Sequence, residues 1–233
     1  MLTYLISSPT EIDRISNVIK LKNDIEKIID ITAIYPKHVK IPFKNRLIKK
    51  SFERTNRTLK EAELGLLLSH RNAWNTFLKN EEQNALFLES DSKILNNTIL
   101  KKNFNFVHNK FDIFFWGAFD GRIKLYTKSK FNIDENYIVG IPVINSLYCT
   151  YGYSLNKKAA LYLLNQTNKV NYPVDFWKIR LYNSSLSIGG VYPELISTNP
   201  LFNSNIQSSK FNFFNNFFIK KIIDFKNELI SYK

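Results

Sequence analysis

The sequence predicts an α/β domain with a mainly parallel central sheet flanked by helices. The first observation is the order of the opening segments: an apolar run at residues 2–6, a helical pattern at 11–22 and a second apolar run at 28–34. Strand, helix and strand in that order are typical of a parallel sheet. The second observation is that compact apolar runs recur at residues 84–88 and 111–116. The third is size, because 233 residues, 44% of them hydrophobic, suffice for one domain with a sizeable core.

Positive charge is concentrated after the second apolar run. Residues 37–60 hold nine Lys or Arg residues against one acid, Glu53, and we interpret them as a basic loop or lid. The whole chain carries a net charge of +13. Such an excess suits nucleic acid, an anionic membrane surface or a phosphorylated substrate as partner, and composition alone does not choose among them. The heavy use of Lys, Asn and Ile, as in AT-rich genomes, accounts for part of it.

A helix is expected to follow the basic stretch. Thr58 and Glu61, three residues apart, form a capping box, so the helix runs from there to about residue 79. Within it Glu63 and His70 are seven residues apart, nearly two turns. Both side chains are therefore expected on one helix face.

The next predicted strand ends in two acids. Residues 84–88 are followed by Glu89, Ser90 and Asp91, and ligands bind at the carboxyl ends of strands in α/β sheets. Hard divalent cations prefer oxygen ligands, and such a cation neutralises a departing diphosphate. Glu89 and Asp91 are therefore candidate metal ligands, with an ordinary solvated turn as the alternative.

The second half of the chain continues the α/β pattern. Residues 146–155 are expected to be extended, and Asn156 is expected to cap a helix over 157–165. A turn at 172–175 leads into a further helix, with Asp175 near its start.

The composition changes near Pro200. We therefore divide the chain into a domain over residues 1–200 and a basic, Phe-rich tail over 201–233. On a helix the apolar side chains of the tail recur at spacings of three and four, which predicts an amphipathic helix lying in an anionic membrane surface. Packing on its own domain or on a second subunit is the alternative. The candidate membrane-binding residues are Phe214, Phe218, Lys220, Lys221, Ile222 and Phe225.

Other classes of protein fit the sequence poorly. Cys149 is the single cysteine, so no internal disulfide forms and a zinc site is not expected. The N-terminal apolar run is too short for a signal peptide, and no window reaches the roughly 18 apolar residues of a membrane span. We expect a cytoplasmic protein, soluble or bound to a surface. No RNA-binding signature, zinc knuckle or helix-turn-helix spacing is found, so no nucleic-acid partner is expected.

Several segments, taken in chain order, carry a family resemblance. Residues 63–70 read Glu-Leu-Gly-Leu-Leu-Leu-Ser-His, and residues 85–91 read Ala-Leu-Phe-Leu-Glu-Ser-Asp. With residues 111–117, 151–164 and 173–175, they resemble glycosyltransferase family 25, the bacterial lipooligosaccharide glycosyltransferases, of the β-galactosyltransferase kind. The resemblance spans residues 1–197. The sequence departs from the family's pattern where Ala62, Leu66 and Ser90 replace Gly, Cys and Asp, and where Ala160 stands near the usual Gly.

The resemblance implies an activity and its cofactor. It implies a GT-A-type nucleotide-sugar-binding domain, a UDP-sugar donor, a divalent cation (Mn²⁺ or Mg²⁺) and inversion at the anomeric carbon. Asp91 is then the expected direct metal ligand, and Glu89 a second ligand or a donor-binding group. The expected reaction moves a hexose, with galactose favoured by the family, to a lipid-linked, phosphorylated lipooligosaccharide or lipopolysaccharide core at the inner face of the cytoplasmic membrane. The alternatives are a catalytically silent, membrane-binding relative and a nucleic-acid-binding protein.

The resemblance also suggests a base, which an inverting transfer needs next to the acceptor hydroxyl. Asp175 matches the Pro-Val-Asp of the family, and the start of the following helix is expected to lower its pKa. A plain helix N-cap is the alternative, and Asp120 is the reserve candidate for the base.

Four further residues complete the expected site. By the same resemblance, Glu63, Ser69 and His70 are expected at the donor pocket. Trp177, close to Asp175, is a candidate for stacking on an acceptor sugar, with core packing as the alternative.

Overall fold

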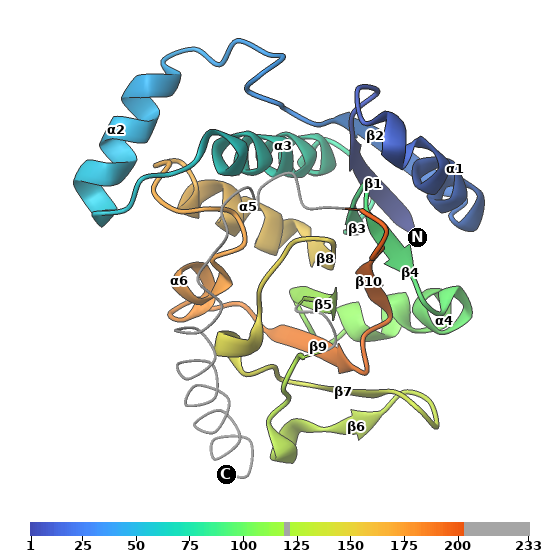
Figure 1. The fold of residues 1–233 in the computed structure, drawn as a ribbon. Coiled ribbons are helices and arrows are strands. Elements are labelled where there is room, and N and C mark those ends of the chain that lie inside the picture. Colours follow the sequence, from blue (N-terminus) through green and yellow to red (C-terminus); the bar gives the residue numbers. More distant parts are fainter. Residues whose placement is uncertain (119–121, 203–233) are drawn as a thin grey trace, which may run out of the picture.

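A central sheet with helices on both faces organises the chain (Figure 1). The structure is a computed structural model that describes residues 1–118 and 122–202. The strands are β1 (Leu2–Ser7), β2 (Lys27–Thr32), β3 (Asn84–Glu89), β4 (Ser92–Ile94), β5 (Ile113–Gly117), β6 (Phe131–Asn132), β7 (Ile138–Gly140), β8 (Gly152–Asn156), β9 (Ile188–Tyr192) and β10 (Ile196–Thr198). The α-helices are α1 (Ile15–Asp24), α2 (Lys44–Thr55), α3 (Glu61–Leu78), α4 (Asn97–His108), α5 (Lys157–Gln166) and α6 (Trp177–Leu181). Short 3₁₀ helices are η1 (Ile12–Arg14), η2 (Thr127–Ser129) and η3 (Ile144–Ser146).

Strand pairing in the eight-stranded sheet is mixed, in the order β2-β1-β3-β8-β5-β9-β7-β6, while β4 and β10 form a separate pair. β1 is parallel to both β2 and β3, and β5 is parallel to β9. β8 runs antiparallel between β3 and β5, and β7 and β6 continue antiparallel beyond β9. The predicted parallel pairing thus holds for the strands that open the chain, whereas the second half is mixed. Apolar alternation does not reveal strand direction, so the sequence could not separate the two.

The three parallel strands position the functional site. Because β1, β2 and β3 run in one direction, the segments that follow them meet at the same edge of the sheet. These segments are residues 8–14, 33–38 and 90–91.

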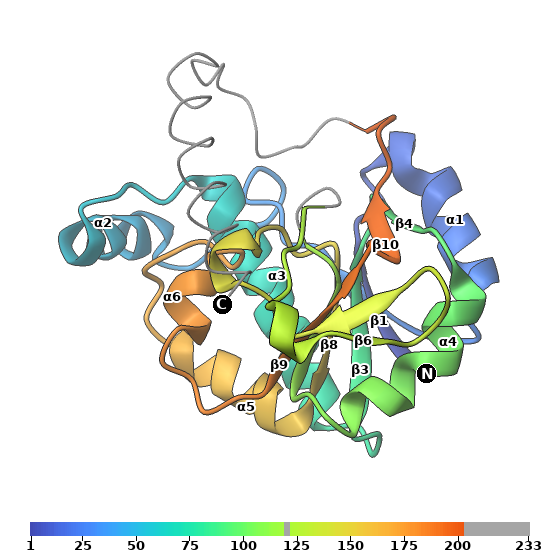
Figure 2. The same cartoon turned by 90° about the horizontal axis from the view of Figure 1, so that it is seen from below.

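The core lies on both faces of this sheet, since successive strand residues point to opposite sides. Tyr4 and Phe87 pack in the cluster that includes side chains of α3, α5 and α6. Their neighbours Leu5 and Leu86 pack in the other cluster, with side chains of α1 and α4. Figure 2 shows the two helical layers on opposite sides of the strands.

The predicted basic loop at residues 37–60 is a loop and a helix. α2 occupies Lys44–Thr55, so the prediction of a loop throughout is wrong. Leu47 and Ile48 pack against the main core, and Ser51 is buried. The few apolar residues of this inward face stand among many basic residues, which masks the helical pattern in the sequence.

Helix ends are set by partly different residues than the sequence suggested. α3 begins at Glu61 with Lys60 as N-cap, and Glu63 accepts a hydrogen bond from the Lys60 backbone nitrogen at 2.8 Å. The predicted capping box of Thr58 with Glu61 is therefore wrong by two residues. The predicted Asn156 cap is confirmed, because its side chain accepts from the Ala159 nitrogen at 2.9 Å.

One prediction falls partly outside the described residues, and another is confirmed only in part. Residues 203–233, which hold all the candidate membrane-binding side chains of the tail, lie outside the described residues. Residues 146–155 are extended as a strand only from Gly152 onward. Within residues 1–118 and 122–202, no helix is both long and apolar enough to cross a membrane.

Candidate active site

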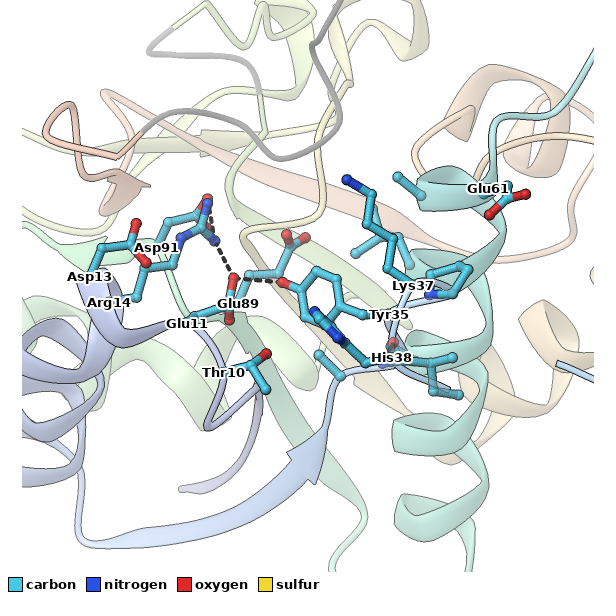
Figure 3. Close-up of a pocket in the computed structure, with 16 residues that line it drawn as sticks. Thr10, Glu11, Asp13, Arg14, Tyr35, Lys37, His38, Glu61, Glu89 and Asp91 are labelled. Carbon is cyan, nitrogen blue, oxygen red and sulfur yellow. Dashed lines mark hydrogen bonds and ion pairs between the residues drawn. The ribbon is translucent and has the colours of Figure 1, made fainter. Parts of the chain in front are cut away.

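A cavity of about 380 Å³ opens at the carboxyl edge of the parallel strands (Figure 3). Its walls are the loop and η1 after β1, the loop after β2, the end of β3 and the first half of α3. The polar and charged side chains that line it include Glu11, Asp13, Arg14, Tyr35, Lys37, His38, Ser69, Glu89 and Asp91. Carboxylates, one guanidinium and an aromatic ring thus face one space.

Arg14 is the centre of the charged wall. Its Nη1 lies 3.2 Å from Oε1 of Glu11 and 3.2 Å from Oδ2 of Asp91, and it donates to Ser90 Oγ at 3.0 Å. Ser90 Oγ in turn donates to Glu11 Oε2 at 2.9 Å, and the Tyr35 hydroxyl donates to Glu11 Oε1 at 2.5 Å. Figure 3 shows Asp91, Arg14, Glu11 and Tyr35 in a row across the wall. Ser90, which replaces the middle acid of the motif described above, is therefore part of this network.

Asp91 has one carboxylate oxygen to spare. Burial, followed by the negative charge of Glu89, raises the pKa of Asp91 to about 6, although Arg14 acts in the opposite direction. Oδ1 of Asp91 is buried and has no hydrogen-bond partner among the described residues. A buried acceptor without a partner is costly in free energy, so this atom is available to a cation.

The residues present fit a divalent cation that is shared with a ligand. No group of three or more His, Cys, Asp or Glu side chains in the described ranges could hold a metal alone. Mg²⁺ and similar cations at phosphate sites need one or two carboxylates, because substrate phosphates and water complete the coordination. Asp91 supplies a free oxygen for this purpose, and Glu89 lies on the same wall.

Glu89 lies at the end of a buried row of polar side chains. Trp74 Nε1 donates to the Tyr153 hydroxyl at 2.9 Å, and that hydroxyl lies 2.7 Å from Nδ1 of His70. Because His70 Nε2 faces the Glu89 carboxylate, which only accepts, we expect the ring proton on Nε2 and the Tyr153 hydroxyl as the donor to Nδ1. His70 Nε2 lies 3.4 Å from Glu89 Oε1, to which Thr150 Oγ1 also donates a short hydrogen bond.

These contacts keep Glu89 charged. Burial opposes its charge, but the nearby ring of His70, the hydrogen bond from Thr150 and the charge of Arg14 together lower the pKa of Glu89. The pKa values of Asp91 and Glu89 are therefore shifted in opposite directions, and Glu89 is the more readily ionised of the two.

The helix that carries the motif at residues 63–70 forms part of the cavity wall, but only some of the motif's side chains line it. α3 contributes Glu61, Ala62, Leu66 and Ser69 to the cavity, whereas Glu63 and His70 are on a face turned away from it. Glu63 and His70 therefore do not line this cavity, because the cavity-facing row is displaced by one residue around the helix, and their donor-binding role stays a prediction. Glu63 instead accepts from Arg57 at 2.6 and 3.0 Å.

Ser69 lines the cavity, but its hydroxyl is already engaged. It accepts from the backbone nitrogen of Ile34 at 2.8 Å and donates to the carbonyl of Gly65 at 2.8 Å. A Cβ on Gly65 would lie 2.2 Å from the carbonyl oxygen of Ile34. Gly65 and Ser69 together fix the loop after β2 against α3, and that loop forms one wall of the cavity.

Asp175 lies before α6, outside the wall of this cavity. Burial raises its pKa, and the charges of Glu89 and Glu63 raise it further, against a smaller opposite effect of Arg180. The expected lowering of this pKa is wrong, because burial outweighs any effect of α6, a helix of five residues whose N-cap is Phe176. A carboxylate with a raised pKa is a stronger base, which suits proton abstraction near neutral pH.

Two candidates remain, Trp177 for acceptor stacking and Asp120 as the reserve base. Trp177 is fully buried against Phe115 and Tyr153, and its Nε1 donates to the Cys149 carbonyl at 2.8 Å. It presents no ring face to a sugar, so acceptor stacking by Trp177 is wrong and core packing is correct. Asp120 lies outside the described residues.

Comparison with known families identifies the chain. A family model described as glycosyltransferase family 25 (LPS biosynthesis protein) matches residues 1–177. The chain belongs to this family. The matched range includes every cavity residue and Asp175. Membership implies a glycosyltransferase of lipopolysaccharide biosynthesis, which binds a sugar donor and an acceptor.

The solved structures that match this chain resemble it only distantly. "Crystal Structure of A197 from STIV" is 11% identical, covers 91% of this chain and 100% of that chain, and has a TM-score of 0.40. "Structure of the inositol-1-phosphate CTP transferase from T. maritima" is 14% identical, covers 88% of this chain and 93% of that chain, and has a TM-score of 0.46. Likenesses of this size carry no conclusion about function. No curated protein matches the chain significantly.

The residues that the sequence reasoning missed are those after β1 and β2. Glu11 and Arg14 follow the first strand three positions apart, and Tyr35 follows the second. The rule that ligands bind at the carboxyl ends of parallel strands points to these loops as well as to the acids after β3.

Proposed function

We propose that this family member is a metal-dependent, inverting hexosyltransferase with a GT-A-type fold that uses a UDP-sugar donor. The observation that carries the proposal is the buried, unpartnered Oδ1 of Asp91 on the wall of the cavity. Its neighbour Glu89 is held as an anion by His70 and Thr150. Two carboxylates, one with a free oxygen, beside a cavity at the strand ends suit a cation and a diphosphate.

The donor nucleotide would lie in the cavity between the loops after β1 and β2. Tyr35 and His38 offer ring surface there, and Arg14 and Lys37 offer positive charge. Asp91 would hold the divalent cation, Mn²⁺ or Mg²⁺, with Glu89 as a further ligand or as a support for it. When bound, such a cation neutralises charge that develops on the departing diphosphate.

The transfer itself requires a base, for which Asp175 is our candidate. The acceptor hydroxyl would lose its proton to a carboxylate oxygen of Asp175. The acceptor oxygen would then bond to the anomeric carbon as the bond to the diphosphate breaks, which releases UDP and inverts the configuration. The raised pKa of Asp175 supports this role because it makes the carboxylate a better proton acceptor.

The acceptor that we propose is a lipid-linked, phosphorylated lipooligosaccharide or lipopolysaccharide core, reached at the inner face of the cytoplasmic membrane. Galactose as the transferred sugar rests on the family resemblance alone. Membrane binding by the tail concerns residues outside those described.

A panel of UDP-sugars tests this proposal. We expect thermal stabilisation by UDP with Mn²⁺ and metal-dependent release of UDP from one donor, both lost in Asp91→Ala. In Asp175→Asn we expect UDP with Mn²⁺ to stabilise the protein as before while turnover falls by about 10²-fold or more. Glu135→Gln, at an exposed position, is the control. No stabilisation by any nucleotide with metal would refute the enzyme, whereas binding without turnover of any donor would favour the silent relative.

A further inference from the structure

We propose that α2 and the loop before it form a docking surface for an anionic lipid bilayer. We define the docking face by six exposed residues of this segment: Val39, Lys40, Phe43, Arg46, Lys49 and Phe52. They lie within the part of the chain that the structure describes and far in sequence from the C-terminal tail. In both views α2 stands at the edge of the molecule (Figure 1, Figure 2).

The opposite side of α2 is fastened to the domain. Leu47 and Ile48 pack against the main core, and Ser51 Oγ donates to the carbonyl of Asn171 at 2.7 Å. Lys44 Nζ lies 2.8 Å from Glu61 on α3. The orientation of the helix is therefore fixed, with the docking face turned to solvent.

The charge of the docking face is almost uncompensated. Arg46 and Lys49 are three residues apart on one side of the helix, and Lys40 precedes them in the loop. Among the described residues, no carboxylate lies within ion-pair distance of Lys40 or Arg46, and Glu53 lies 4.0 Å from Lys49. A solvated helix face usually alternates positive and negative charges, which this one does not.

Large apolar side chains stand among these cations. Phe43 is 74% exposed, Phe52 48% and Val39 47%. Phe43 also has a positive φ of 57°, which a bulky residue seldom adopts. Exposed aromatic rings beside basic residues are typical of helices that lie in the headgroup region of anionic membranes.

The position of the face suits a lipid-linked acceptor. Lys37 and His38 line the candidate active site and also a second, shallower cavity of about 550 Å³ that residues of the loop before α2 enclose. A bilayer on the docking face would therefore lie beside the opening of the active site. This last step rests on the proposed function, whereas lipid binding itself does not.

Vesicle partitioning of the full chain tests the proposal. The probes are vesicles of phosphatidylglycerol with phosphatidylcholine, and vesicles of phosphatidylcholine alone. Each Lys or Arg near an anionic surface contributes about 1 kcal/mol, a factor of about five in partitioning, so K40Q/R46Q/K49Q should bind the anionic vesicles about a hundredfold more weakly. K102Q/K128Q/K130Q makes the same change in net charge at exposed positions elsewhere and should partition as the wild type does.

The apolar part of the face has its own variant. F43S/F52S should also release the protein from anionic vesicles, and its residual binding should be more sensitive to salt. Wild-type partitioning of K40Q/R46Q/K49Q would overturn the proposal, as would equal binding of the wild type to both kinds of vesicle. Tighter binding to an oligonucleotide than to anionic vesicles, lost in the same triple variant, would also overturn it and assign the face to nucleic acid.

Failure of this proposal is distinguishable from failure of the proposed function. Stabilisation by UDP with Mn²⁺ is measured on the same variants and should be unchanged, because none of the substituted residues lines the active-site cavity. Vesicle binding without any nucleotide effect would refute the enzyme and leave the docking surface intact.

Discussion

Nη1 of Arg14 lies 3.2 Å from Oδ2 of Asp91, and both side chains are largely withdrawn from water, at 6% and 18% exposed. The same nitrogen faces Glu11, so one cation balances two carboxylates after different strands. This pair joins the turn after β3 to the turn after β1. It also leaves the other Asp91 oxygen facing no protein donor among the described residues.

Arg14→Gln should therefore cost both stability and donor binding. Removing one partner of a buried ion pair leaves uncompensated charge and typically costs about 3–5 kcal/mol. We expect a lower free energy of unfolding in urea and an affinity for UDP with Mn²⁺ at least tenfold weaker. Lys22→Gln breaks the exposed pair with Asp30 and should change stability by less than about 1 kcal/mol. Similar effects of the two substitutions would contradict this account of Arg14.

The buried hydroxyl of Tyr153 should matter far more than that of Tyr4. Both rings stack on Phe87 at 5.3 Å, and both are fully buried. Tyr153→Phe leaves Trp74 Nε1 and His70 Nδ1 without their partner, at a cost of about 1–3 kcal/mol. Tyr4→Phe removes a buried hydroxyl that has no hydrogen-bond partner in the described structure and should be neutral or stabilising.

The ¹⁵N shifts of His70 show whether the Tyr153 hydroxyl orients the imidazole or only fills space in the core. In the wild type its ¹⁵N shifts should show the proton on Nε2, which faces Glu89. In Tyr153→Phe we expect a mixture of tautomers and weaker binding of UDP with Mn²⁺. An unchanged His70 spectrum in that variant would disprove the hydrogen-bond chain.

The sequence revealed the elements better than the contacts between them. Apolar runs located the parallel strands, and the acids after β3 pointed to the correct edge of the sheet. Arg14 and Ser90, by contrast, are 76 positions apart, and His70 and Tyr153 are 83 apart. No local pattern encodes such pairs.

Small rotations and local packing explain the other differences. Glu63 and His70 do share a face of α3, but the cavity lies one residue further around the helix, on the side of Ser69. Burial cannot be read from the sequence. It raises the pKa of Asp175, against the expected lowering, and it leaves no part of the Trp177 side chain exposed to a ligand.

Gly65→Ala should damage the cavity without touching any of its side chains. The new methyl group would lie 2.2 Å from the Ile34 carbonyl oxygen and 2.8 Å from Pro36 Cδ, so the loop after β2 must move away from α3. We expect a loss of about 1–3 kcal/mol in stability, as for other overpacked sites, and weaker UDP binding. Gly190→Ala is the matched control, since its Cβ would meet nothing closer than 3.5 Å. Undiminished UDP binding in Gly65→Ala would show that this wall does not bind the donor.

His108 should make the folded state sensitive to mild acid. Burial, first of all, lowers the pKa of His108 to about 4, from an ordinary 6.5. Its Nδ1 lies 3.3 Å from the Phe111 carbonyl and its Nε2 lies 2.8 Å from Ser154 Oγ, which also accepts from Trp116 Nε1 at 2.9 Å. Because a carbonyl only accepts, Nδ1 carries the proton and the serine hydroxyl donates to Nε2. A second proton on the ring would break this arrangement.

The sign of the pH dependence follows from that depressed pKa. The unfolded chain binds a proton at His108 below about pH 6.5, whereas the folded protein resists it until about pH 4, so this contribution to stability is complete above pH 6.5 and is lost as the pH falls toward 4. Between pH 7.5 and 5 we expect the wild type to lose about 2 kcal/mol more of its unfolding free energy than His108→Gln does. Urea denaturation at both pH values measures this difference. His38→Gln, at an exposed histidine, should show the wild-type dependence on pH, and equal slopes for wild type and His108→Gln would mean that His108 is protonated in the folded protein.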